Sequence, residues 1–132
     1  MQNSIRKGRN LENMNNYLKE HPNANVVEMD TVIGKFEDKK CILTLYFRNS
    51  KLMLMFLIDK YKPSSVTKVF KSLKKQLGTI EFKKLFEVIL TDNGWEFSKP
   101  KEIEIDSKTG EKLINIYYCE PYSSWQKGGI RI

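Results

Sequence analysis

Residues 41–58 read CILTLYFRNSKLMLMFLI, two apolar runs separated by Asn49-Ser50. Apolar runs of this length are typical of strands, and two polar residues are the length of a tight hairpin turn. We therefore expect antiparallel strands at Cys41–Arg48 and Lys51–Ile58. The stretch VVEMDTVI at 26–33 mixes β-branched residues with two acids and predicts a preceding strand. The three strands together form an antiparallel meander.

The next segment has the pattern of a helix that begins at Pro63-Ser64. Its apolar residues repeat with the 3.6-residue period, at Val66, Val69, Phe70, Leu73 and Leu77, and Gly78 marks the end. A short second helix over 81–86, a strand over 88–91, a polar stretch over 98–112 with a turn at SKTG, and a strand over 114–119 follow.

A helix that crosses from the third strand to the fourth brings the later strands alongside the first, in parallel, by a right-handed crossover. We therefore predict an α/β fold with a mixed sheet, in which three antiparallel strands precede helix-linked parallel strands. In open α/β sheets, sites lie at the carboxyl ends of the strands.

Length and composition fit one small domain. The chain has 132 residues, 40% of them hydrophobic, and a formal charge of +7, which favours a polyanionic partner such as nucleic acid. We expect a basic lead-in over residues 1–25 and the core domain over 26–132. Cys41 and Cys119 lie in apolar runs and are predicted to be buried and reduced, with a disulfide as the alternative. No apolar run approaches the roughly 18 residues of a membrane span, so a cytoplasmic protein is expected.

Two carboxylates occupy similar places at strand ends, Asp30 in VEMDTVIG and Asp92 in VILTDNGWEF. An ionised carboxylate at the end of a buried strand is costly unless it is paired or bound to metal. Two such groups on different strands could share Mg²⁺, which takes oxygen ligands. The alternatives are that Asp-Asn-Gly is only a turn composition, and that Asp30 caps or pairs with a lysine.

The blocks VVEMDTVIG, ILTDNGWEF and YYCEPYSSWQKGG, in this order, resemble the catalytic core of bacterial insertion-sequence transposases. The family is insertion sequence family thirty, within the integrase-like superfamily of ribonuclease-H-like fold. The resemblance extends from about Arg6 to Gly129. It implies that Asp30 and Asp92 are the first two acids of a DDE motif, which bind Mg²⁺ or Mn²⁺ where DNA strands are cleaved and joined.

The resemblance also implies partners and a setting. Such a polynucleotidyl transferase acts on transposon ends and target DNA in the bacterial cytoplasm, at the nucleoid, and a homo-oligomeric state is compatible with it. The third acid of the motif is expected near position 131, where this sequence has Arg131. Glu120 is an unlikely substitute. We therefore expect a core trimmed at both ends, without its C-terminal helices, that has little or no catalytic activity. The alternative is a non-catalytic DNA-binding or oligomerising remnant.

Several further residues have both a functional and a structural interpretation. Trp95 either packs in the core or stacks on a nucleotide beside the site. Glu28 and Glu96 are either acids that support the metal ligands or ordinary charged residues, paired or solvated. The resemblance predicts that one loop runs past the site toward DNA, with the contacts made by Tyr122, Trp125, Gln126 and Lys127; a plain surface loop is the alternative.

The lysines between Lys60 and Lys84 are typical of a solvated helix face. The alternative for some of them is contact with DNA phosphates.

Overall fold

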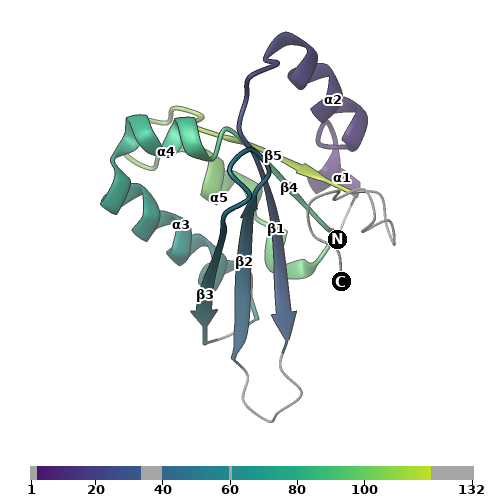
Figure 1. The fold of residues 1–132 in the computed structure, drawn as a ribbon. Helices are drawn as coiled ribbons and strands as arrows, with labels where there is room; N and C mark the ends of the chain where they lie inside the picture. The colour runs from purple at the N-terminus through teal and green to yellow at the C-terminus, as the bar shows by residue number, and fades with distance from the viewer. Residues whose placement is uncertain (1–2, 34–39, 60, 120–132) are drawn as a thin grey trace.

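A computed structural model describes residues 3–33, 40–59 and 61–119 of the chain. Its centre is a five-stranded sheet in the order β3-β2-β1-β4-β5 (Figure 1). The strands are β1 (Val26–Ile33), β2 (Cys41–Phe47), β3 (Met53–Ile58), β4 (Val88–Thr91) and β5 (Asn115–Tyr118). β2 pairs antiparallel with β1 and β3, whereas β4 pairs parallel with β1 and β5. The predicted mixed sheet is confirmed.

The helices are α1 (Asn3–Arg6), α2 (Leu11–Glu20), α3 (Pro63–Leu77), α4 (Thr79–Leu85) and α5 (Pro100–Glu104), with a single 3₁₀ turn, η1 (Trp95–Phe97). The helix expected from Pro63 is confirmed: proline occupies its first turn, and Gly78 ends it with a φ of 83°. The second helix begins at Thr79, two residues earlier than predicted. The helices α1 and α5 and the turn η1 are additional to the predicted elements.

The connection between β2 and β3 is longer than the predicted two-residue turn. Lys51 has a φ of 60°, and its amide donates to the carbonyl of Phe47. The Phe47 amide in turn donates to the carbonyl of Leu52. β3 therefore begins at Met53 and not at Lys51, because residues 48–52 are used to reverse the chain.

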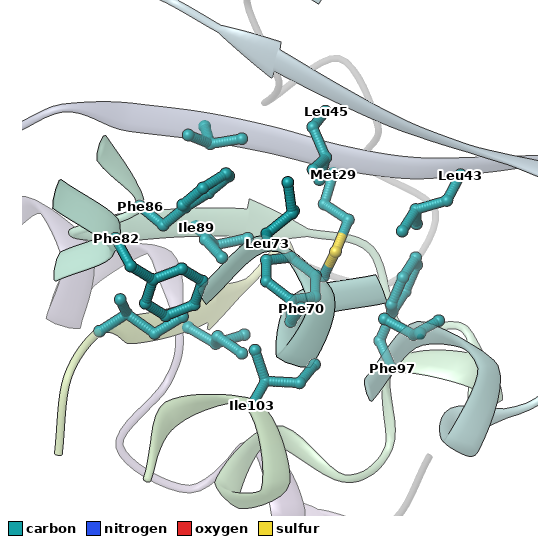
Figure 2. Packing of buried hydrophobic residues seen from close by; sticks show 14 of the residues in the cluster. Met29, Leu43, Leu45, Phe70, Leu73, Phe82, Phe86, Ile89, Phe97 and Ile103 are labelled. Carbon is teal, nitrogen blue, oxygen red and sulfur yellow. The ribbon is translucent and has the colours of Figure 1, made fainter. Parts of the chain in front are cut away.

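The main core lies between the sheet and the helices α3 and α4 (Figure 2). Phe70 from α3, Phe82 from α4 and Phe86 form a cluster of aromatic rings with centroids 5.3 to 6.4 Å apart. They pack against alternate residues of the central strands, including Met29 and Ile89, which are fully buried. Because side chains alternate across a strand, this packing leaves the intervening residues of β1 and β4 for the opposite face.

The helix α2 packs near β5 on that opposite face. Its Met14 is buried together with Val26, Val88, Leu90 and Tyr117. Asn10 and Asn13 form a reciprocal capping box at its first turn. No described helix is long and apolar enough to cross a membrane.

The N-terminal segment is also held by charge. Both terminal nitrogens of Arg9 donate to the carboxylate of Glu104, at 2.5 and 2.7 Å, and Glu104 is 1% exposed. Arg9 also donates to the carbonyl of Ile116 in β5. A bidentate pair of this kind is geometrically specific. Arg9 thus ties the start of the chain to α5 and β5.

Cys41 and Cys119 are both buried, as predicted.

Candidate functional site

The parallel pairing of β1, β4 and β5 stops at one row, although β1 itself continues beside β2 to Ile33. Their last paired row contains Met29 of β1, Thr91 of β4 and Tyr118 of β5. The Thr91 hydroxyl donates to the Met29 carbonyl at 2.9 Å, which ties the two strands together at this row. Asp30 and Asp92 each follow that row by one residue. The two aspartates predicted from the sequence therefore stand at neighbouring positions, although 62 residues separate them in the chain.

The surroundings of the two carboxylates can be stated separately. Asp92 follows the end of β4, and its charge lies close enough to Glu96 and Tyr61 to raise the pKa of both. Met29 packs on the α3 side, so Asp30, the next residue, faces the α2 side. Both aspartates are partly exposed. The site thus offers two solvent-accessible carboxylates at the carboxyl edge of adjacent parallel strands.

Backbone amides orient both carboxylates. Asp30 Oδ1 accepts the amide of Thr31 at 2.8 Å, and Asp92 Oδ1 accepts the amide of Gly94 at 3.2 Å. The second bond is an Asx turn, the local structure that Asp favours at the start of a tight turn. These bonds restrict the rotation of both side chains.

The loop after Asp92 is fixed from several sides. The side-chain Nδ2 of Asn93 donates to the backbone carbonyl of Cys119 at 2.7 Å, which joins the loop to the end of β5. The Phe97 amide donates to the carbonyl of Gly94 and closes η1. The buried Tyr118 hydroxyl then donates to the carbonyl of Phe97. Asp92 is therefore held in a loop with several hydrogen bonds, and the interpretation of Asp-Asn-Gly as a turn is confirmed.

Glu96 is 2% exposed, so the interpretation as a solvated loop residue is wrong. Its carboxylate lies against Gly94, where a Cβ atom would be 1.9 Å from Glu96 Oε1. Burial raises the pKa of Glu96, and the charge of Asp92 adds to the rise, while a hydrogen bond from Tyr61 opposes it. Burial, followed by the hydrogen bond to Glu96, also raises the pKa of Tyr61. Glu96 is thus a buried acid directly behind the loop that carries Asp92.

Asn93 Oδ1 is a buried polar atom near this edge with no hydrogen-bond partner within the described ranges. Buried polar groups are usually satisfied, and exceptions often mark functional positions or sites for a bound water or ion. Thr31 Oγ1 and Glu96 Oε1 are also buried, and the Thr31 and Tyr61 hydroxyls lie close enough to the Glu96 carboxylate to oppose the rise of its pKa. These side chains make the interior polar beside the loop that carries Asp92.

Glu28 is fully buried two residues before Asp30, and Arg48 Nε donates to it at 2.8 Å. The interpretation of Glu28 as an ion-paired acid is therefore confirmed, with arginine as the partner and not lysine. A buried carboxylate without a cation beside it would be costly. The pair neutralises charge on the same face as Asp30.

Trp95 follows Gly94 in the loop and is 57% exposed, so its interpretation as a core residue is wrong. Its indole is available at the rim of the site. Tyr122, Trp125, Gln126 and Lys127 lie outside the described residues, as do Lys60, Glu120 and Arg131.

The described residues contain no cluster of three or more His, Cys, Asp or Glu side chains that could hold a metal ion. The site they supply is a pair of carboxylates.

Comparison with known proteins gives a match in structure only. No family model matches the chain, and no curated protein sequence does. Among solved structures, the chain is similar to the catalytic core domain of BIV integrase, with a TM-score of 0.54 and 18% sequence identity. The match covers 79% of this chain and 60% of the integrase chain, so it extends over less than two thirds of that protein. The chain has the ribonuclease-H-like fold of an integrase core.

Proposed function

We propose that this domain is an integrase-like DNA-transposition core of the type found in insertion sequence family thirty. The observation that carries the proposal is the placement of Asp30 and Asp92 one residue beyond the paired row of two adjacent parallel strands. The three motif blocks that resemble the family support the same assignment. The parent chemistry is hydrolysis of a DNA phosphodiester, which frees a 3′-hydroxyl. That hydroxyl then attacks a phosphodiester of target DNA in the bacterial cytoplasm, which joins the strands and releases a 3′-hydroxyl of the target.

The two aspartates fit a divalent cation such as Mg²⁺ or Mn²⁺. They supply oxygen donors, they are partly exposed, and backbone amides orient one oxygen of each. Mg²⁺ prefers oxygen ligands and usually retains several waters, which partial exposure allows. The buried Oδ1 of Asn93, next to Asp92, adds a further polar atom. When bound, such an ion supplies charge stabilisation and activation of a hydroxyl at the scissile phosphate.

The chain's own residues have distinct parts in this proposal. Asp30 and Asp92 hold the cation, and the bonded loop 92–97 keeps Asp92 in place. The exposed indole of Trp95 offers a stacking surface to a base beside the cut site. Two carboxylates bind a divalent ion more weakly than three. An ion held by Asp30 and Asp92 alone would therefore be bound weakly.

The test is a calorimetric titration with Mn²⁺ and with Mg²⁺. Wild type is compared with Asp30→Asn/Asp92→Asn, which keeps the size of both side chains and removes both charges. A matched control, Glu81→Gln/Glu111→Gln, removes two exposed acids near the opposite end of β4. We expect binding in wild type and control, and at least a tenfold loss of affinity in the aspartate variant.

Equal binding by all three proteins would refute the assignment of Asp30 and Asp92. Absence of binding in all three would refute the metal site in this domain altogether. Circular dichroism of each variant ensures that a loss of binding is not a loss of fold.

A second candidate function, an oligomerising module, has its own observation. β3 is an edge strand, and Met53, Met55 and Leu57 on it are 39%, 66% and 66% exposed. Exposed apolar edges favour pairing with another chain. A second copy pairing through β3 would make the protein a dimer in light scattering, and Met55→Lys/Leu57→Lys would restore the monomer. A wild type that is monomeric at high concentration contradicts this candidate.

A further inference from the structure

Two hollows lie side by side around the short helix α5. The first has a volume of about 610 Å³ and is lined by Lys7, Lys99 and Lys101 together with serine hydroxyls. The second, of about 630 Å³, is lined by Lys68 and Lys71 of α3 and again by Lys101. Both hollows also share Glu102. A basic surface therefore runs from the N-terminal segment across α5 to the first half of α3.

The charge of this surface is not balanced from within. The ion pairs of the described residues use Arg9, Arg48, Lys74 and Lys83, so none includes a lysine of the hollows. Arg9 lines the first hollow, but Glu104 neutralises it. Glu102, the acid shared by both hollows, accepts a hydrogen bond from the Thr67 hydroxyl at 3.2 Å. Five lysines thus face one carboxylate.

We propose that these lysines form a binding surface for the phosphate backbone of duplex DNA, separate from the two aspartates. Lysine and serine side chains are common phosphate contacts, and they position a duplex without reading its sequence. Clustered like charges repel each other, and a polyanion relieves that repulsion. Acidic protein partners would also be attracted, but the two hollows together present five lysines and several hydroxyls along one surface, and a row of phosphates matches such a series of donors.

The surface is continuous with the candidate active site along the chain. Asp92, the loop 92–97, Ser98 and Lys99 follow one another directly, and Ser98 and Lys99 line the first hollow. A duplex whose cut site lies at the aspartates would then extend past Trp95 onto the lysines. The inference rests on the proposed function for its choice of DNA, but its evidence is the charge and shape of the hollows.

The test is binding of a labelled duplex by fluorescence anisotropy in EDTA, over a range of about 50 to 200 mM salt. One variant is Lys7→Gln/Lys99→Gln/Lys101→Gln. Its matched control, Lys19→Gln/Lys75→Gln/Lys84→Gln, removes the same charge from exposed lysines outside both hollows. The second hollow is tested with Lys68→Gln/Lys71→Gln against Lys75→Gln/Lys84→Gln.

Each phosphate contact contributes a slope of about −0.9 to the dependence of log affinity on log salt. We therefore expect the three-lysine variant to bind at least tenfold more weakly than its control and to have a slope flatter by roughly 2 to 3. Equal losses in variant and control would overturn the proposal, because they would show an effect of net charge alone. A wild type that binds no duplex at low salt would overturn it as well.

Asp30→Asn/Asp92→Asn separates this inference from the proposed function. With metal absent, that variant should bind duplex DNA as tightly as wild type and with the same salt slope. Failure of the metal titration alongside normal DNA binding would refute the metal site and leave the lysine surface standing. Metal binding that depends on the two aspartates, together with DNA binding that does not depend on the lysines, would refute only the lysine surface.

Discussion

Replacing Gly94 by alanine tests how tightly the loop behind Asp92 is packed. Gly94 has φ −64° and ψ 147°, a backbone conformation that alanine adopts readily. In such a position the change to alanine would normally stabilise a protein by about 0.4–1 kcal/mol through the unfolded state. Here a Cβ atom would lie 1.9 Å from Glu96 Oε1 and 2.8 Å from its Cδ, and real Cβ contacts are not shorter than 3.0 Å.

The Glu96 carboxylate must therefore move, although it is 2% exposed. Overpacking a core costs roughly 1–3 kcal/mol, and loss of the Tyr61–Glu96 hydrogen bond adds about 1 kcal/mol. After subtraction of the gain in the unfolded state, we expect a net loss of about 2 kcal/mol. For 132 residues, the unfolding entropy converts this loss to a fall of roughly 7 °C in Tm.

Urea unfolding of Gly94→Ala, Glu96→Ala and the double variant measures the coupling. Because Glu96→Ala removes the obstructing carboxylate, the double variant should be no less stable than Glu96→Ala alone. Gly110→Ala serves as the control: its φ of 73° strains alanine, but nothing lies within 4 Å. Its cost should not change when Glu96 is removed. If the costs of Gly94→Ala and Glu96→Ala add within about 0.5 kcal/mol, the packing argument fails.

Three further predictions concern the residues around the site. Arg9→Ala leaves the buried carboxylate of Glu104 without its cation, and urea unfolding should show a loss of about 3–5 kcal/mol; a loss below about 1 kcal/mol would contradict a structural role for the pair. Burial raises the pKa of Glu96 above 4.5, so the folded state holds this proton more tightly than the unfolded state, and the stabilisation present at acid pH is lost as the pH rises through the folded pKa. The unfolding free energy of wild type minus that of Glu96→Gln should therefore decline from pH 4.5 upward in a series of urea titrations. A difference that does not change with pH would mean that the pKa of Glu96 is not raised. Tyr118→Phe leaves the Phe97 carbonyl without its buried donor and should cost about 1–3 kcal/mol in the same assay, whereas an unchanged midpoint would show that the bond contributes nothing.

The strands and α3 could be predicted from the sequence because their hydrophobic period matches their geometry. β1 and β4 begin and end where the apolar runs do, and the parallel crossover follows from the helix between them. Asp30 and Asp92 could be placed at one edge by the same argument. The helix α5 was missed because its five residues, PKEIE, are mostly polar. Pro100 in its first turn was the available signal.

The surroundings of the aspartates could not be predicted because they are tertiary. In the sequence, Glu96 has the features of a charged loop residue. In the structure it is buried against Gly94, which lacks a Cβ atom, and beside Tyr61 from the segment before α3. The same holds for the basic surface, whose lysines come from three segments. Local sequence patterns carry no information on tertiary contacts between distant segments.

The contacts of Arg9 have a consequence for synthesis on the ribosome. Glu104 and the carbonyl of Ile116 lie 95 and 107 residues downstream of Arg9. The β1-β2-β3 meander, by contrast, can pair as soon as its own residues have emerged, while the other edge of β1 waits for β4. Chains emerge at about 5–20 residues per second. The guanidinium of Arg9 is therefore exposed to solvent for several seconds before Glu104 has been synthesised. The segment around Arg9 is therefore translated before the meander and docked after it.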